Sequence, residues 1–279
     1  AVLTRPAETI SVLRSLLWRV SSWSELRGRG VFFLRNYTKV LAAASISGII
    51  IFSQLAYWHW ATGEWVVYSY QDQGFSWLHP HISDVLFSYR AGWLTYSPVM
   101  VFAVAGLWFL RKQHRNIFPA ALAFCVVFLY VTSAWDIWWY GGSLGSRAMV
   151  QSYAMWLFPL AAFAEWVTDR KAGSSARLAA ITTALVGGLL IWFNLWWTHQ
   201  AHWGGLFQTE QMTKRYFWKV LGRTELNREW LKFLDAKEEY KGAEGNGHEI
   251  FVHNFESDTT QVSADKPIEG AKSLILTQE

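Results

Sequence analysis

Five long apolar stretches, each almost free of charged residues, limit most strongly what this chain can fold into. Each runs for roughly 18 to 21 residues, the length at which a helix crosses the ~30 Å hydrocarbon core of a bilayer. Core helices of soluble proteins rarely run this long without a charge. The chain is therefore predicted to be an all-α polytopic membrane protein with about five transmembrane helices. They are expected at about 40–60, 93–110, 117–135, 148–167 and 178–197.

The composition and the charge distribution support this interpretation. Of the 279 residues, 52% are hydrophobic and only 16% are charged, which is low for a soluble domain. Thirteen of the 25 Lys and Arg residues lie in three segments that five crossings place on one side of the membrane. By the positive-inside rule that side is the cytoplasm, so the net charge of +4 reports topology and indicates no nucleic-acid partner. The three segments are 1–39, 111–116 and 168–177.

The chain divides into a membrane part and an outer tail. Residues 1–39 form a basic cytoplasmic segment, and residues 40–197 form the transmembrane helical domain. From 198 to 241 we expect a helical tail on the outer side, followed by a flexible linker at 242–248. The stretches "HEIFVHNFE" and "KSLILTQ" are typical of strands, so 249–279 is predicted to be the beginning of an outer β domain.

Local signals place further helices. Residues 8–20 have an apolar face with arginines near its edge, which predicts a helix that either lies on the inner leaflet or packs on the bundle. In the tail, Thr213 is a candidate N-cap for a helix that ends at Gly222. Thr224 is a candidate N-cap for a second helix that continues to about 241.

Tryptophan residues gather at the predicted outer boundary of the membrane. Twelve lie there, against four at the inner boundary, an asymmetry larger than an aromatic belt requires. Indole faces also stack on sugar rings, so sugar binding and a belt with ordinary packing are equal alternatives. The four inner residues are Trp18, Trp23, Trp108 and Trp166. The twelve outer residues are Trp58, Trp60, Trp65, Trp77, Trp93, Trp135, Trp138, Trp139, Trp192, Trp196, Trp197 and Trp203.

The outer loop "WDIWWYGGSLGSR" is the first candidate site. Gly141, Gly142 and Gly145 permit positive φ and let the backbone approach a ligand closely. Arg147 lies at the outer mouth of the fourth span, where a guanidinium is costly unless it reaches water or an anion such as a phosphate. Asp136 is interpreted as a partner that orients Arg147, as a metal ligand or as a ligand of a sugar hydroxyl; an ion pair with Arg147 that only closes the loop is the structural alternative. The other candidate substrate contacts in this loop are Trp138, Trp139 and Tyr140.

The second candidate site is the outer loop at 70–98, which holds more ionisable residues than a connector needs. His79 and His81 are candidate ligands of a divalent metal, although the spacing places no third ligand beside them. No other cofactor is indicated. Ser83 is expected to cap a short helix that ends at about Phe87. The remaining candidate residues of this loop are Asp72, Asp84 and Arg90.

These loops carry a resemblance to a known family. "GFSWLHPHISDVLFSYRAGWLTYSP" resembles a motif of bacterial membrane glycosyltransferases that use polyprenyl-phosphate sugars and are related to the protein O-mannosyltransferases of the GT-C fold. "WDIWWYGGSLGSR" is similar to a second loop motif of that family, and "LTRP" to the cytoplasmic end of one of its earlier helices. "QMTKRYFWKVLGRTEL" looks like a segment of the Bacteroidetes-type members. The resemblance covers most of residues 1–240.

The resemblance implies a reaction. A sugar on a polyprenyl-phosphate carrier is transferred to a glycan, lipid or protein acceptor at the outer face of the bacterial inner membrane. An acid deprotonates or orients the acceptor hydroxyl, while cationic groups stabilise the departing phosphate. By the motif match, Arg147 is the candidate contact of the carrier phosphate and Arg90 is a second one.

The same resemblance implies an incomplete enzyme. The acid of the family lies in an earlier outer loop, and we expect this chain to begin after it and to end inside the β domain. Asp72 is then the best substitute for the base within the chain.

Two other interpretations stand beside the glycosyltransferase. A non-enzymatic membrane anchor would display the outer β domain for binding a glycan or a partner, which the linker and the terminal strands suggest. A transporter is the weakest alternative, because the predicted spans hold few ionisable residues near the membrane centre.

Overall fold

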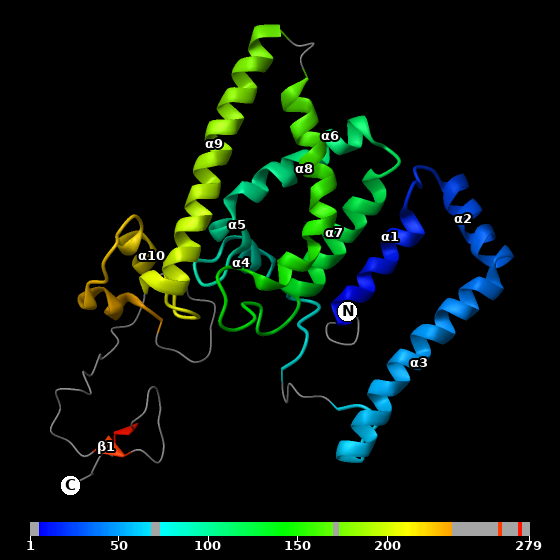
Figure 1. Cartoon of the computed structure of the whole chain (residues 1–279), viewed down its shortest axis with the longest axis horizontal. Helices are drawn as coiled ribbons and strands as arrows, with labels where there is room; N and C mark the ends of the chain where they lie inside the picture. Colours follow the sequence, from blue (N-terminus) through cyan, green and yellow to red (C-terminus); the bar gives the residue numbers. More distant parts are fainter. Residues whose placement is uncertain (1–5, 68–72, 170–172, 236–261, 264–272, 275–279) are drawn as a thin grey trace. The chain divides into compact units, whose positions relative to one another are not determined.

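The computed structural model describes residues 6–67, 73–169, 173–235, 262–263 and 273–274, and within these ranges the chain is mostly helical (Figure 1). The chain divides into two compact units, Ala1–Met212 and Thr213–Glu279. The elements of the first unit are η1 (Pro6–Ser11), α1 (Val12–Leu17), α2 (Trp23–Arg35), α3 (Tyr37–Thr62), α4 (Ile82–Phe87), α5 (Trp93–Tyr96), η2 (Pro98–Met100), α6 (Val101–Gln113), α7 (Phe118–Ser133), η3 (Arg147–Ser152), α8 (Tyr153–Thr168), α9 (Gly173–His199) and η5 (Gln200–Gly204).

Among the residues that the structure describes, two segments are long and apolar enough to cross a membrane, Tyr37–Thr62 and Arg177–Gly204. They correspond to α3 and to most of α9 with η5, and they match the spans expected at 40–60 and 178–197. The most apolar stretch of each is unburied within the protein, as lipid-facing helices require. Both begin near basic residues and end in aromatic ones, which is the pattern of spans that run in the same direction.

The other three expected spans contain shorter or interrupted helices, and their crossing of a membrane stays a prediction. The stretch at 93–110 is broken into α5, η2 and α6, because Pro98 at the first position of η2 has no N–H to donate to an uninterrupted helix. The stretch at 117–135 contains α7, which has 16 residues. The stretch at 148–167 begins with the 3-10 helix η3 before the 16-residue helix α8.

A side chain of α9 meets the break between α5 and η2. The side-chain amide of Asn194 donates to the carbonyl of Tyr96 at 2.6 Å and to the hydroxyl of Ser97 at 3.2 Å. An interrupted helix leaves carbonyl groups without their usual partners, and a buried carbonyl is costly without a donor. Asn194 therefore stabilises the point at which the predicted continuous helix ends.

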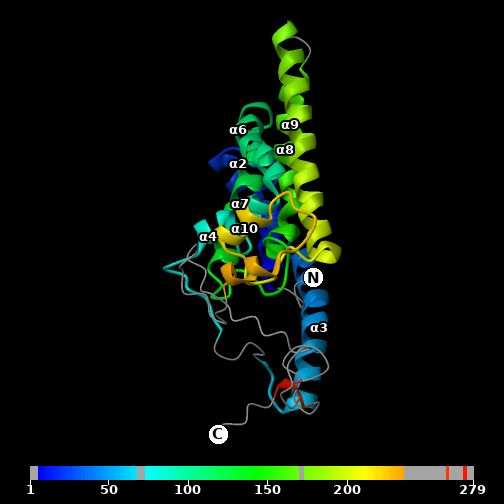
Figure 2. The same ribbon diagram turned by 90° about the vertical axis from the view of Figure 1, so that its left-hand side faces the viewer.

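Helices α6 and α8 form the closest helix pair of the first unit and lie side by side in both views (Figures 1 and 2). A Cβ placed on Gly106 would lie 2.0 Å from the carbonyl oxygen of Pro159, so the two backbones touch where glycine leaves room. Aromatic rings stack across the same contact, Phe102 on Phe163 with centroids 5.1 Å apart and Phe109 on Trp166 at 4.3 Å. Close backbone packing and aromatic stacking therefore hold α6 and α8 together along this contact.

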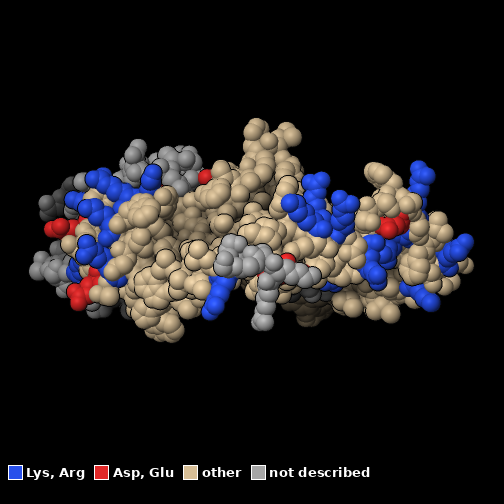
Figure 3. All heavy atoms as spheres, turned by 90° about the horizontal axis from the view of Figure 1, so that it is seen from above, with Lys and Arg blue, Asp and Glu red and all other residues tan. Residues whose placement is uncertain are grey.

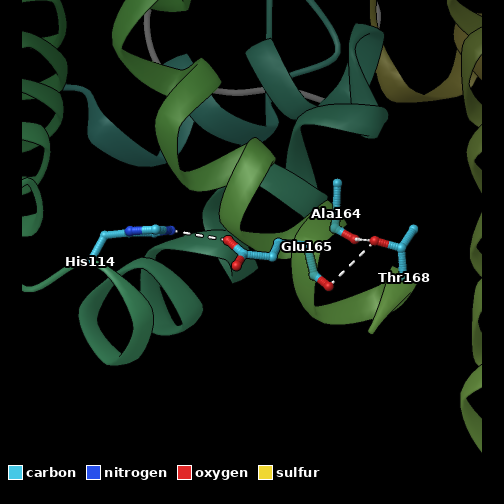
Figure 4. A network of polar contacts seen from close by, with 4 residues as sticks. All are labelled: His114, Ala164, Glu165 and Thr168. Carbon is cyan, nitrogen blue, oxygen red and sulfur yellow. Dashed lines mark hydrogen bonds and ion pairs between the residues drawn. The ribbon is translucent and has the colours of Figure 1, made fainter. Parts of the chain in front are cut away.

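One polar contact joins the C-terminal ends of these two helices (Figure 4). Nε2 of His114 lies 3.0 Å from Oε2 of Glu165, and both side chains are substantially exposed. One turn further on, the hydroxyl of Thr168 donates to the carbonyl of Ala164 at 2.8 Å. An exposed ion pair of this kind contributes about 0–1 kcal/mol, so it fixes the local geometry more than it stabilises the fold.

The helix predicted at 8–20 packs on the bundle, the second of the two alternatives for this segment. It consists of η1 and α1, and both contact α7. The ring of Trp18 meets that of Phe158 in α8 edge to face, with centroids 5.4 Å apart. Val20, just after α1, is buried. One side of the segment at 8–20 is therefore covered by α7 and α8.

The second unit contains α10 (Lys214–Val220) and the 3-10 helix η6 (Arg228–Phe233). Thr213 caps α10 as expected, because its hydroxyl accepts from the backbone N–H of Tyr216 at 3.2 Å. The same hydroxyl donates to the carbonyl of Phe233 at 2.5 Å, which joins the two elements. Gly222, with φ of 74°, follows the end of α10 as predicted.

The second helix of the tail differs from the prediction. Thr224 is not its cap; the N-cap is Asn227, whose side chain accepts from the backbone N–H of Glu229 at 2.9 Å. The element is a short 3-10 helix, and the expected continuation to 241 and the linker at 242–248 lie outside the described residues.

Of the predicted β domain, the structure describes two strands of two residues each. β1 (Val262–Ser263) pairs antiparallel with β2 (Ser273–Leu274). β2 falls within the expected strand "KSLILTQ", whereas β1 lies between the two stretches expected to be strands. The strand expected in "HEIFVHNFE" lies outside the described residues.

Candidate functional site

The two loops singled out by sequence pair with each other through their backbones. Phe75 and Trp135 form an isolated antiparallel bridge. On either side of it, the N–H of Ser76 donates to the carbonyl of Ala134 at 2.6 Å and the N–H of Asp136 to that of Gly74 at 3.0 Å. Residues about sixty positions apart in the chain therefore form one loop cluster, which brings the two candidate sites together.

The carboxylate of Asp136 holds this pairing in place. Its Oδ2 accepts from the backbone N–H of Gly74 at 2.8 Å, and its Oδ1 accepts from the hydroxyl of Ser76 at 2.7 Å. Asp136 makes no ion pair with Arg147, so the two roles that join it to that residue are wrong. Both oxygens are engaged within the loops, which also weakens the metal and sugar-hydroxyl interpretations.

The tryptophans of the glycine-rich loop are packed inside the cluster. Trp138 is 1% exposed and Trp139 is 6% exposed, and their rings meet edge to face at 5.7 Å. His81 stacks on Trp138 with ring centroids 6.3 Å apart. Rings enclosed in this way offer no face to a sugar, so packing is the better alternative for these two residues. Outer tryptophans that do keep an exposed ring are Trp60, Trp65, Trp77, Trp192 and Trp203.

Arg90 lies beneath the same aromatic residues. Its guanidinium carbon is 4.7 Å from the centroid of the Trp139 ring, a cation–π contact, and the residue is only 2% exposed. Its backbone N–H donates to the hydroxyl of Ser88 at 3.0 Å. The guanidinium is therefore withdrawn from the surface, where a carrier phosphate would have to arrive.

The histidines of the 70–98 loop take structural positions. Nδ1 of His81 lies 3.2 Å from Oδ2 of Asp84, and the N–H of His81 donates to the carbonyl of Ser133 at 2.7 Å. Because His81 is fixed in this way, α4 begins directly after it at Ile82, and Ser83 lies inside the helix instead of capping it. His79 contacts the loop through its N–H, which donates to the carbonyl of Ser76.

The described part of the chain contains no set of side chains suited to bind a divalent metal. No group of three His, Cys, Asp or Glu side chains lies close enough there to hold one ion. Asp72, the candidate base, lies outside the described residues.

The glycines of the loop form a turn that needs their conformational freedom. Gly141 has φ of 68° and Gly145 has φ of 63°, and a Cβ on Gly145 would lie 3.2 Å from Cβ of Tyr96. Tyr140 also has positive φ, 56°, and its hydroxyl donates to the carbonyl of Thr132 at 2.9 Å. Positive φ in a residue with a side chain costs about 1–2 kcal/mol, which the surrounding contacts offset.

Arg147 lies beside this turn and is exposed. Its Nη2 is 3.9 Å from the point that a Cβ on Gly141 would occupy. Its guanidinium makes no hydrogen bond or ion pair with any residue that the structure describes. It begins η3, whose other residues include the buried Ala148 and Met149, so its backbone is anchored while its side chain stays available.

Glu210 reaches the same point and was missed by the sequence analysis. Its Oε1 is 3.4 Å from the Cβ position of Gly141, and Cγ2 of Thr209 is 3.0 Å from that of Gly142. The buried side chains of Leu206 and Phe207 anchor this segment after η5. Glu210 has φ of 65°, and no feature of the sequence predicts this backbone conformation. The turn therefore carries a cation and a carboxylate from two distant segments.

No protein-family model matches this chain, and no similar protein was found among the curated proteins or among the solved structures. The family resemblance of the two loops accordingly stays a prediction.

Proposed function

We propose that this chain is the C-terminal part of a membrane glycosyltransferase that moves a sugar from a polyprenyl-phosphate carrier to an acceptor at the outer face of the membrane. In this proposal α6, α7 and α8 cross the membrane together with α3 and α9, the segment 1–39 faces the cytoplasm, and the loop cluster faces outward. The family resemblance of the two loops and the distribution of basic residues support the proposal.

The observation that carries the proposal is the exposed guanidinium of Arg147 beside the Gly141 turn. A cation at a membrane surface that has no partner among the described residues is suited to an anionic ligand, and a phosphate accepts a forked pair of hydrogen bonds from it. Because Gly141 has no side chain, the space beside Arg147 and Glu210 that a Cβ would enter stays open.

The proposed reaction is a nucleophilic substitution at the anomeric carbon of the sugar. A bond forms between the acceptor oxygen and the anomeric carbon while the bond from that carbon to the carrier phosphate breaks, and the phosphate leaves with the electron pair. Arg147 stabilises the charge that develops on the leaving phosphate. The hydroxyl proton passes to a base, for which Asp72 is the candidate within this chain. Glu210 lies beside the same Gly141 turn as Arg147.

The test is sugar transfer by the purified protein in proteoliposomes, with a panel of polyprenyl-phosphate hexoses as donors. Arg147→Ala is expected to lower transfer by about a hundredfold or more, and Arg147→Lys to restore part of it. Arg115→Ala, which removes an exposed arginine between α6 and α7, is the control and should transfer normally. Full activity of Arg147→Ala would remove this residue from the mechanism.

A non-enzymatic membrane anchor is the second candidate. It is favoured by the division of the chain after Met212 into a separate compact unit. If the chain is an anchor, the purified protein should transfer sugar from no donor of the panel. Arg147→Ala should then leave membrane insertion and folding unchanged.

A further inference from the structure

A hollow of about 290 Å³ lies between the end of α1 and the first turns of α2. Its lining combines two guanidinium groups with apolar and backbone surface. The lining residues are Arg19, Val20, Glu25, Gly28, Arg29 and Phe32. None of them belongs to the loop cluster of the proposed transfer site.

One of the two arginines of the hollow, Arg29, is held in position by a backbone carbonyl. Nη2 of Arg29 donates to the carbonyl of Trp18 at 2.5 Å, which fixes the guanidinium against the end of α1. Arg19 has φ of 58°, so the chain turns sharply there before entering α2. A side chain held before the ligand arrives loses less conformational entropy when it binds.

The hollow is positive although Glu25 contributes to its lining. Oε2 of Glu25 accepts from the backbone N–H of Ser21 at 2.6 Å and from its hydroxyl at 2.9 Å, so this oxygen is occupied at the start of α2. Further arginines lie on the same two helices, and Figure 3 shows several Lys and Arg side chains around a small acidic patch on its right-hand side, the side of α2 in Figure 1. A phosphate there would meet two guanidinium groups and one carboxylate, a lining that is positive on balance.

The chain connects the hollow directly to a membrane-crossing segment. α2 ends at Arg35, and α3, one of the two segments able to cross a membrane, begins at Tyr37. The exposed side chains of Trp23, Phe32 and Leu34 give α2 an apolar surface suited to the headgroup boundary. The hollow therefore lies within the length of one 13-residue helix of the point where α3 enters the bilayer.

We propose that this hollow binds the phosphate of an anionic phospholipid headgroup in the leaflet that the N-terminal end of α3 enters. Arg19 and Arg29 bind the phosphate oxygens, and Phe32 and Val20 contact the glycerol and the upper acyl chain. The inference needs α3 to cross the membrane and does not need sugar transfer.

The experiment is native mass spectrometry of the purified full chain in neutral detergent, titrated with a short-chain phosphatidylglycerol. Arg19→Ala with Arg29→Ala is expected to raise the dissociation constant of the first bound lipid about tenfold or more. Arg14→Ala with Arg27→Ala removes the same charge from exposed positions of α1 and α2 outside the hollow and should change the constant about twofold at most. Equal losses for the two pairs would overturn the site in favour of diffuse attraction.

A second pair of variants leaves the bond between Arg29 and Trp18 intact. A Cβ on Gly28 or on Gly30 meets nothing within 4 Å, so Gly28→Glu and Gly30→Glu both fit and change the charge of α2 equally. Only Gly28 lines the hollow, and Gly28→Glu should weaken lipid binding while Gly30→Glu retains most of it. Equal effects would contradict the proposal.

Inorganic phosphate and a zwitterionic phosphatidylcholine complete the test. Both are expected to bind far more weakly than phosphatidylglycerol. If inorganic phosphate bound as tightly, the hollow would be a site for free anions, and if phosphatidylcholine bound as tightly, the arginines would not select the lipid; either result overturns the inference.

Discussion

The carboxylate of Asp136 accepts a hydrogen bond at 2.7 Å from the hydroxyl of Ser76, a residue 60 positions earlier in the chain. The contact joins the two outer loops beside the backbone bridge of Phe75 and Trp135. A carboxylate with two donors in a part-buried setting is a strong local clamp.

Removing this clamp should destabilise the loop cluster. Asp136→Ala is expected to lower the free energy of unfolding by about 2–3 kcal/mol, because it leaves the donors of Gly74 and Ser76 without an acceptor. Ser76→Ala should lower it by about 1 kcal/mol, since it removes one bond and leaves the other. Thermal unfolding in detergent, followed by tryptophan fluorescence, measures both. An unfolding temperature of Asp136→Ala equal to that of the parent would show that the clamp contributes nothing.

A side chain on Gly141 should block the proposed phosphate site without unfolding it. Asparagine tolerates positive φ, so Gly141→Asn keeps the turn while its side chain fills the space between Arg147 and Glu210. We expect sugar transfer to fall about tenfold or more, as for a displaced ligand-binding group. Gly205→Asn is the matched control, because Gly205 has φ of 70° and open space around its Cβ position. Equal transfer by the two variants would separate the turn from the activity.

Asn194 should matter for stability although it lies in an exposed, apolar helix. Asn194→Leu removes the donor that meets the carbonyl of Tyr96, and the expected loss is about 1–3 kcal/mol of the free energy of unfolding. Ser97→Ala, which removes only the weaker contact of Asn194, should lose about 0.5–1 kcal/mol. Unfolding temperatures in detergent measure the difference, and a loss for Ser97→Ala as large as that for Asn194→Leu would contradict the assignment.

Acid should loosen the start of α2. The hydrogen bond from the backbone N–H of Ser21, with further bonds from the Ser21 and Ser22 side chains and the Ser22 backbone, lowers the pKa of Glu25 below its ordinary value of 4.5. A carboxyl whose pKa is depressed in the folded state stabilises that state above 4.5, and this contribution is lost as the pH falls through the depressed value. Protection of the first α2 amides against hydrogen exchange, corrected for intrinsic rates, should therefore fall as the pH drops from 4.5 through the lowered pKa of Glu25. Glu25→Gln should show no such pH dependence; a parent-like fall in that variant would point to another group.

The parts of the fold that depend on neighbours in sequence could be predicted, and those that depend on distant contacts could not. α3 and α9 follow from unbroken apolar runs with basic starts, which are local properties. The break at Pro98 in the stretch at 93–110 is also local, but hydropathy alone does not reveal it. Thr213 and Gly222 were predicted correctly because capping is local as well.

The candidate site shows the same division. The residue types marked each of the two loops as a candidate site, but composition alone does not tell an aromatic residue that faces a ligand from one that packs in a loop. Trp138, Trp139 and Arg90 proved to be buried together for this reason. Glu210 reaches Gly141 from a segment about 70 residues away through backbone geometry that its sequence does not encode locally.

The shortness of α7 and α8 has a consequence for the surrounding lipid. Each has 16 residues and rises about 24 Å, some 6 Å less than a typical hydrocarbon core. A bilayer that accepts these helices as spans relieves the hydrophobic mismatch by thinning beside them. In the proposed topology, headgroups of the outer leaflet then move closer to the loop cluster, and the carrier phosphate of the proposed reaction would approach Arg147 from the lipid side with less of its chain drawn out of the membrane.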